Sequence, residues 1–173
     1  MSNVILVTYA SRTGSTAGVA EAIGKTLTEA GAQVDVRPMG DVTDLTPYRA
    51  VVAGSAIQNK QWLPEAMQFV QTHRAALAEK PFAAFLVCMT MAMKNEKWRE
   101  QANIPEWLAP VRALVKPVSE GYFAGTLDIS KVEPRSARIG FRLSVMSGFW
   151  SEGDHRNWGD IHAWARDLAD RLS

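Results

Sequence analysis

A hydroxyl-rich loop, Ser11-Arg12-Thr13-Gly14-Ser15-Thr16, lies between an apolar run at residues 4–9 and a helical pattern. That pattern consists of apolar residues three and four positions apart: Val19, Ala22, Ile23, Leu27 and Ala30. A strand, a short loop and a helix in this order bring unpaired backbone N–H groups, the positive end of the helix dipole and several hydroxyls to one point. The stretch therefore predicts that all six loop residues bind a phosphate group.

A simpler explanation is that Ser11, Ser15 or Thr16 only caps the helix. Capping accounts for one such residue, whereas Ser, Thr or Gly occupies five of the six positions in residues 11–16. The loop has neither the Walker spacing Gly-x-x-x-x-Gly-Lys nor the dinucleotide spacing Gly-x-Gly-x-x-Gly. The sequence therefore does not favour ATP or NAD as the ligand of this loop.

Apolar or alternating runs at residues 4–9, 33–37, 49–54, 82–88 and 118–123 alternate with helical patterns along the chain. This alternation predicts an α/β fold, a doubly wound parallel sheet of five strands with helices on both faces. At 173 residues, the chain is expected to form a single domain, 1–173.

Composition narrows the class of protein. One cysteine, Cys88, allows no internal disulfide and no C-x-x-C metal pattern, and no metal site is expected. The sequence shows no leader pattern and no apolar run of about 20 residues, so a cytoplasmic protein is expected. A net charge of +1, with Lys and Arg balanced by Asp and Glu, argues against nucleic-acid binding.

The pattern Val7-x-Tyr9-x-Ser11-x-x-Gly14-x-Thr16-x-x-x-Ala20-x-x-Ile23 resembles the flavodoxin phosphate-loop signature and departs from it at Thr8. The resemblance implies that residues 11–16 hold the 5′-phosphate of FMN. It also implies the flavodoxin strand order 2-1-3-4-5.

In a doubly wound sheet, ligands bind beyond the carboxyl ends of the strands, so two further loops are expected to contact the flavin. The first provides small residues and amides, and the second an apolar wall containing methionines. Their expected cofactor-binding residues are Ser55, Ala56, Ile57, Gln58, Asn59 and Trp62, and Met89, Thr90, Met91 and Ala92. The methionines could instead fill the core, and Trp62 either covers the ring, as aromatic residues often do in flavodoxins, or faces the core.

An insertion of about residues 126–157 separates the fifth strand from the last helix. Within it, residues 136–146 predict a helix with Ile139, Leu143 and Met146 on one side; Arg135, Arg138 and Arg142 lie on another. One interpretation is a charged, solvated face above a face packed on the core. The other is a docking surface for an anionic partner, such as a lipid headgroup layer, an acidic protein or a carboxylate substrate, with Phe149 and Trp150 as an apolar anchor.

Further motifs are similar to those of the menaquinone-dependent protoporphyrinogen oxidase family: Arg12 in the loop, Gly54-Ser55-x-Ile57, Ala124-Gly125-x-Leu127 and Met146-Ser147-Gly148. This resemblance implies an FMN-dependent oxidoreductase of heme biosynthesis that passes electrons from a tetrapyrrole precursor to a quinone. It also implies that the insertion, through residues 135–150, meets the membrane. The chain departs from that family in having Phe149-Trp150 after the last motif.

The sequence thus leads to two functional hypotheses. The first is an FMN-dependent oxidoreductase that transfers electrons from an organic substrate to a quinone or another acceptor, with no catalytic acid or base assigned. The second is a flavodoxin that carries electrons between protein donors and acceptors. Such carriers are typically strongly acidic, and the charge of +1 lacks that feature.

Overall fold

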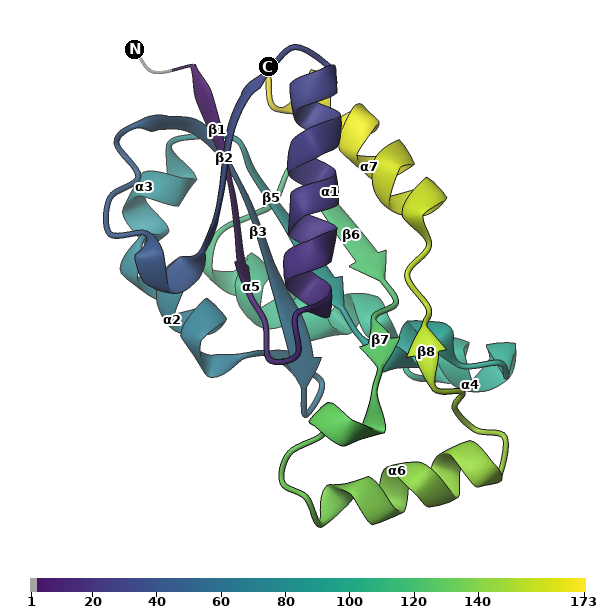
Figure 1. The fold of residues 1–173 in the computed structure, drawn as a ribbon. Helices are drawn as coiled ribbons and strands as arrows, with labels where there is room; N and C mark the ends of the chain where they lie inside the picture. Colours follow the sequence, from purple (N-terminus) through teal and green to yellow (C-terminus); the bar gives the residue numbers. More distant parts are fainter. Residues whose placement is uncertain (1–2) are drawn as a thin grey trace.

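The parallel sheet lies at the centre of the computed structural model, which describes residues 3–173. Its strands are β1 (Val4–Ala10), β2 (Gln33–Pro38), β3 (Tyr48–Gln58), β5 (Phe82–Val87) and β6 (Ser119–Phe123). They run in the order β2-β1-β3-β5-β6, with every neighbouring pair parallel (Figure 1). Counted over the parallel strands alone, this is the expected order 2-1-3-4-5, so the fold prediction is confirmed.

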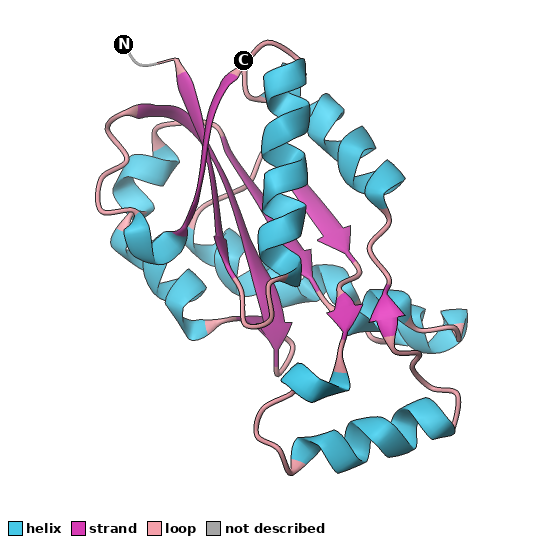
Figure 2. Cartoon of the chain, in the orientation of Figure 1, coloured by secondary structure: helices cyan, strands magenta, loops and turns pink. Residues whose placement is uncertain are grey.

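Helices cover both faces of the sheet (Figure 2). Helices α1 (Ser15–Glu29) and α7 (Trp158–Arg171) pack on one face, where they meet Ile5 and Val7 of β1. Helices α2 (Pro64–Thr72), α3 (Arg74–Ala78) and α5 (Ala109–Leu114) pack on the other face, against Leu6 and Ala10. Alternate residues of one strand thus enter opposite cores, which explains why the strands read as nearly continuous apolar runs.

Strand β3 is longer than the expected strand over residues 49–54. It continues to Gln58, turns through Asn59 and Lys60, whose φ angles are 53° and 60°, and returns as β4 (Gln61–Trp62). Positive φ at both central residues is characteristic of the two-residue turns that match the twist of a hairpin. The segment predicted as a loop is therefore a projecting hairpin at the carboxyl end of the central strand.

The segment between β5 and β6 is helical but interrupted. It consists of α4 (Glu96–Gln101), a 3-10 turn at Ile104–Leu108 and α5. Pro105 and Pro110 lie in the first turn of the 3-10 segment and of α5, respectively, where a missing N–H is tolerated.

The insertion leaves the sheet through β7 (Thr126–Leu127) and returns through β8 (Gly153–Asp154), which pair antiparallel. Between them lie a 3-10 turn, Ile129–Lys131, and helix α6 (Ala137–Met146), within the expected range of 136–146. Figure 1 shows α6 beyond the carboxyl ends of the parallel strands.

The apolar side of α6 is exposed. Ile139, Leu143 and Met146 have exposed fractions of 66%, 60% and 83%. The interpretation in which this side packs on the core is therefore wrong: α6 contacts the rest of the protein through other residues.

Candidate functional site

The loop at residues 11–16 is held in shape by its own side chains. Gly14 has a φ of 93°, a left-handed conformation that glycine adopts without strain, and its N–H donates a hydrogen bond to Ser11 Oγ at 3.0 Å. Gly14 directly precedes α1, whose first backbone N–H groups have no partner within the helix. Ser11 thus shapes the loop, and the start of α1 presents donors to a bound anion.

Thr16, in the first turn of α1, is completely buried. Its Oγ1 atom has no hydrogen-bond partner among residues 3–173. A buried hydroxyl without a partner costs free energy. Its position at the helix start suggests that a ligand oxygen provides the missing partner.

A large cavity of about 960 Å³ opens beside this loop. Its walls come from the ends of β1, β3, β5 and β6, as expected for a doubly wound sheet, and from the insertion. Its lining includes Arg12, Thr13 and Ser15; Ala56, Ile57, Gln58 and Asn59; Val87, Cys88 and Met89; Gly125 and Thr126; and Lys131, Val132, Glu133, Pro134, Ala137 and Phe141. Half of the sixteen expected site residues thus meet around one cavity.

The remaining expected residues are placed differently. Gly14 lines a neighbouring cavity, and Thr90, Met91 and Ala92 form a 3-10 turn outside the lining of the large one. Ser55 is buried, where its Oγ accepts a hydrogen bond from Leu63 N at 3.0 Å and donates one to Ala56 O at 2.7 Å. Ser55 therefore fixes the backbone of the β3–β4 hairpin, because its hydroxyl is engaged within the protein.

Trp62 is only 2% exposed and packs in the core cluster with Leu63 and Ala66. The expectation that Trp62 stacks on a flavin ring is therefore wrong, and the core position is the one observed. The cause is the β3–β4 hairpin: Trp62 pairs with Ile57 across it, and the side chain enters the core under α2.

Arg12 and Cys88 have local roles. The guanidinium of Arg12 forms a two-pronged ion pair with Glu65 at the start of α2 and holds the pKa of that carboxyl below its ordinary value. Burial raises the pKa of the Cys88 thiol to about 11, so the sulfur stays protonated, as expected for an inert buried cysteine.

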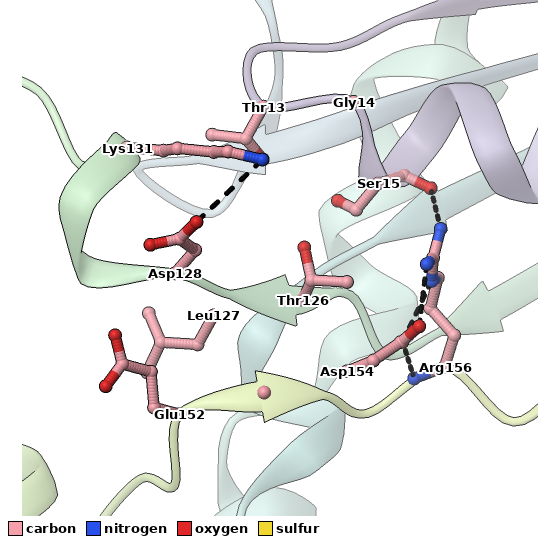
Figure 3. A pocket seen from close by; sticks show the side chains of 11 residues that line it. Thr13, Gly14, Ser15, Thr126, Leu127, Asp128, Lys131, Glu152, Asp154 and Arg156 are labelled. Atoms are coloured by element: carbon pink, nitrogen blue, oxygen red, sulfur yellow. Dashed lines mark hydrogen bonds and ion pairs between the residues drawn. The ribbon is translucent and has the colours of Figure 1, made fainter.

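A small cavity of about 550 Å³ adjoins the same loop on the side of the β7–β8 ribbon (Figure 3). Arg156 lines it and binds Asp154 with two hydrogen bonds, Nε to Oδ1 at 2.9 Å and Nη2 to Oδ2 at 2.6 Å. Its Nη1 also donates to the carbonyl of Ser15 at 3.5 Å. The hydrogen bonds from Arg156 lower the pKa of Asp154, so the Asp154 carboxylate remains charged.

Residues 6–139 match the family described as the flavodoxin domain, which is more than half of the chain. The chain belongs to the flavodoxin family. No curated protein matches it.

Solved structures show the same fold. A short-chain flavodoxin associated with a non-canonical PDU bacterial microcompartment is 13% identical, with a TM-score of 0.61 and complete coverage of both chains. A flavodoxin from the domain Archaea is 18% identical, with a TM-score of 0.57 and 98% coverage of both chains. Flavodoxin 2 from Bacillus cereus is 25% identical, with a TM-score of 0.50, over 86% of this chain and all of that one.

FMN is the cofactor of this flavodoxin-family protein. The structure offers a place for its phosphate: the N-terminus of α1, the hydroxyls of Thr13 and Ser15, and the buried Thr16 Oγ1, which has no partner within the described residues. The large cavity adjoins this point and has room for a flavin ring. The residues present therefore fit FMN.

The cavity residues between Gly125 and Phe141 were not predicted from the sequence. Gly125 and Thr126 lie two and three residues after the end of the fifth parallel strand, and the rule that ligands bind at the carboxyl ends of strands could have indicated them. Lys131, Pro134 and Phe141 carry no such signal, because their approach to the loop at residues 11–16 depends on how the insertion folds.

Proposed function

We propose that the protein is an FMN-dependent oxidoreductase that oxidises an organic substrate in the large cavity and passes the electrons to a quinone. The resemblance to menaquinone-dependent protoporphyrinogen oxidases supports a tetrapyrrole precursor as the substrate. The observation that carries the proposal is the position of the insertion. Its apolar residues line the same cavity as the loop at residues 11–16 and the β3–β4 hairpin; they are Val132, Pro134, Ala137 and Phe141.

The size and character of the cavity support a substrate site. Its volume of about 960 Å³ lies at the upper end of the range of roughly 300–1,000 Å³ that is usual for ligand pockets. A protein that only exchanges electrons with other proteins needs the flavin edge at its surface. Here the insertion contributes apolar side chains, including Pro134 and Phe141, to the lining of the cavity.

In this proposal, the protein positions its ligands. FMN supplies the redox chemistry when bound, accepting electrons from the substrate and releasing them to the acceptor. Ala56 and Gln58 of β3, and Asn59 in the turn that follows, line the cavity and would provide polar groups for the heteroatom edge of the ring. Cys88 takes no part as a nucleophile, because its thiol is protonated at neutral pH.

The second hypothesis, an electron carrier, is favoured by the family itself, since the chain belongs to the flavodoxins. The two functions differ in one measurable property. A carrier is reduced by a protein partner in a salt-dependent reaction, whereas the oxidoreductase is reduced by a small organic substrate alone.

The test is anaerobic reduction of the FMN-loaded protein by a protoporphyrinogen, followed through the visible absorbance of oxidised flavin, and reoxidation by a menaquinone analogue. We expect Ala137→Trp, on the insertion side of the cavity, to slow substrate reduction at least tenfold, and the FMN content of the variant is measured in parallel to separate this effect from a loss of cofactor. The control is Ile139→Trp on the exposed side of the same helix. A wild-type protein that stays oxidised with every porphyrinogen, but is reduced by a flavodoxin reductase, would favour the carrier.

We also propose that α6 contacts a membrane, where a quinone would be reached. Within residues 3–173, no helix combines the length and apolar character needed to cross a bilayer, so the contact would be peripheral. Ile139, Leu143 and Met146 form the exposed apolar side of α6, and Arg135 and Arg142 lie beside it. An apolar stripe next to cations is the arrangement by which amphipathic helices bind anionic lipid surfaces.

A further inference from the structure

The wall between the two cavities has an unusual donor set. Thr13, Ser15, Thr126 and Lys131 line both the large and the small cavity. Thr13 and Ser15 belong to the loop that precedes α1, whereas Thr126 and Lys131 belong to the insertion. Figure 3 shows the side chain of Lys131 extending from the insertion toward the side of the cavity that the loop at residues 11–16 forms. Three hydroxyls and one ammonium thus converge where the phosphate of FMN is expected.

The charges around this point are mostly compensated within the protein. Lys131, Arg12 and Arg156 are the cations in the linings of the two cavities. Arg12 is paired with Glu65 through two hydrogen bonds, and Arg156 is paired with Asp154 in the same way. Neither guanidinium is therefore free to neutralise a bound phosphate fully.

Lys131 differs from these two arginines. Its Nζ atom lies 3.8 Å from Asp128 Oδ2, which is longer than a hydrogen bond. The other oxygen of Asp128 is occupied by Ser130, whose N–H and Oγ donate to it at 3.0 Å and 2.5 Å. The carboxylate is thus held mainly by its own turn, and the ammonium group has capacity for a second anion.

The small cavity also contains more acidic than basic groups. Asp128, Glu152 and Asp154 line it with Lys131 and Arg156. A phosphate dianion at the start of α1 would face this negative surplus, and without Lys131 the repulsion would increase.

We infer that the insertion completes the FMN phosphate site, with Lys131 as a charged ligand of the phosphate and Thr126 as a further hydroxyl donor. The phosphate would then be enclosed by two distant parts of the chain, the loop at residues 11–16 and residues 126–131. This inference rests on the FMN cofactor alone and holds whether the protein is an oxidoreductase or a carrier.

The test compares FMN with riboflavin, which lacks the phosphate. Apoprotein is titrated with each compound, and binding is followed by quenching of flavin fluorescence. We expect Lys131→Gln to weaken FMN binding about tenfold, a typical effect of one partly exposed charge-assisted hydrogen bond, and to leave riboflavin binding unchanged. Thr126→Val is expected to act in the same direction with a smaller effect.

Lys97→Gln is the matched control, because it removes the same charge from an exposed position on α4. It should change neither affinity. The FMN affinity of the wild type should also fall more steeply with salt than that of Lys131→Gln. Unchanged FMN binding in Lys131→Gln, an equal loss for FMN and riboflavin, or an equal effect of Lys97→Gln would overturn the inference. None of these readouts depends on turnover, so they are independent of the proposed oxidoreductase activity.

Discussion

Replacing Thr16 by valine should have opposite effects on the apoprotein and on its FMN complex. The Thr16 side chain is fully buried, and its Oγ1 has no partner among the described residues. Valine has nearly the same shape and removes the uncompensated hydroxyl. We therefore expect Thr16→Val to stabilise the apoprotein by about 1 kcal/mol, the lower end of the cost of an unpaired buried polar group.

The same change should weaken FMN binding. If Thr16 Oγ1 donates to the phosphate, the variant loses a hydrogen bond to a charged group, about 1.5–3 kcal/mol, which corresponds to roughly a ten- to hundredfold higher Kd. Ligand stabilisation follows the ratio of FMN concentration to Kd. At a fixed FMN excess, the stability advantage of the variant should therefore disappear or reverse.

Thermal unfolding with and without FMN, together with a fluorescence titration, measures both effects. For a chain of this size, about 1 kcal/mol corresponds to a Tm shift of roughly 2–4 °C. Thr8→Val is the matched control, because Thr8 is also fully buried with an Oγ1 that lacks a partner within residues 3–173, but it lies within β1 and not in the first turn of α1. A Thr16→Val apoprotein that is less stable and binds FMN normally would refute the reasoning.

Two further predictions concern the insertion and the fold. Changing Arg135 and Arg142 together to Gln should weaken sedimentation of the protein with anionic vesicles at low salt. The control is the double variant Lys25→Gln and Arg166→Gln, which removes two exposed charges elsewhere and should sediment like the wild type. Equal vesicle binding by both double variants would contradict the membrane proposal. Hydrogen bonds from Arg112 hold the pKa of Glu120 below its ordinary value of 4.5. The ionised Glu120 carboxylate therefore stabilises the folded state above pH 4.5, and this stabilisation is lost as the pH falls through the pKa that Glu120 has in the folded protein. In urea unfolding at a series of pH values, the free energy of unfolding of Glu120→Gln should fall less steeply below pH 4.5 than that of the wild type. An equal fall in both proteins would contradict the role given to Glu120.

The elements that could be predicted from sequence are those specified by local periodicity. Nearly continuous apolar runs identified the strands β1, β3 and β5, because both faces of the sheet are covered there. The edge strands β2 and β6 are less buried, and they were identified from shorter or alternating runs. The loop at residues 11–16 could be recognised because its shape depends on consecutive residues, Gly14 for the turn and Ser11 for the hydrogen bond to it.

The parts that were missed depend on contacts between distant residues. The position of Trp62 follows from a hairpin whose second strand has two residues, too short for any alternation to show. The exposure of Ile139 and Leu143 depends on how α6 meets the rest of the protein, and a helical period is the same for a buried and an exposed apolar side. Lys131 approaches Thr13 only because the insertion folds back over the carboxyl ends of the strands.

The pairing of β7 with β8 brings the entry and exit of the insertion together, with Thr126 opposite Asp154. A segment anchored at two adjacent points is a separable module: a short hairpin turn could connect the same two strands without displacing the sheet. A protein engineer could therefore excise α6 or graft it onto a shorter scaffold of the same topology. In this architecture, a change confined to one peripheral segment could alter what lies over the carboxyl ends of the strands while the parallel sheet stays constant.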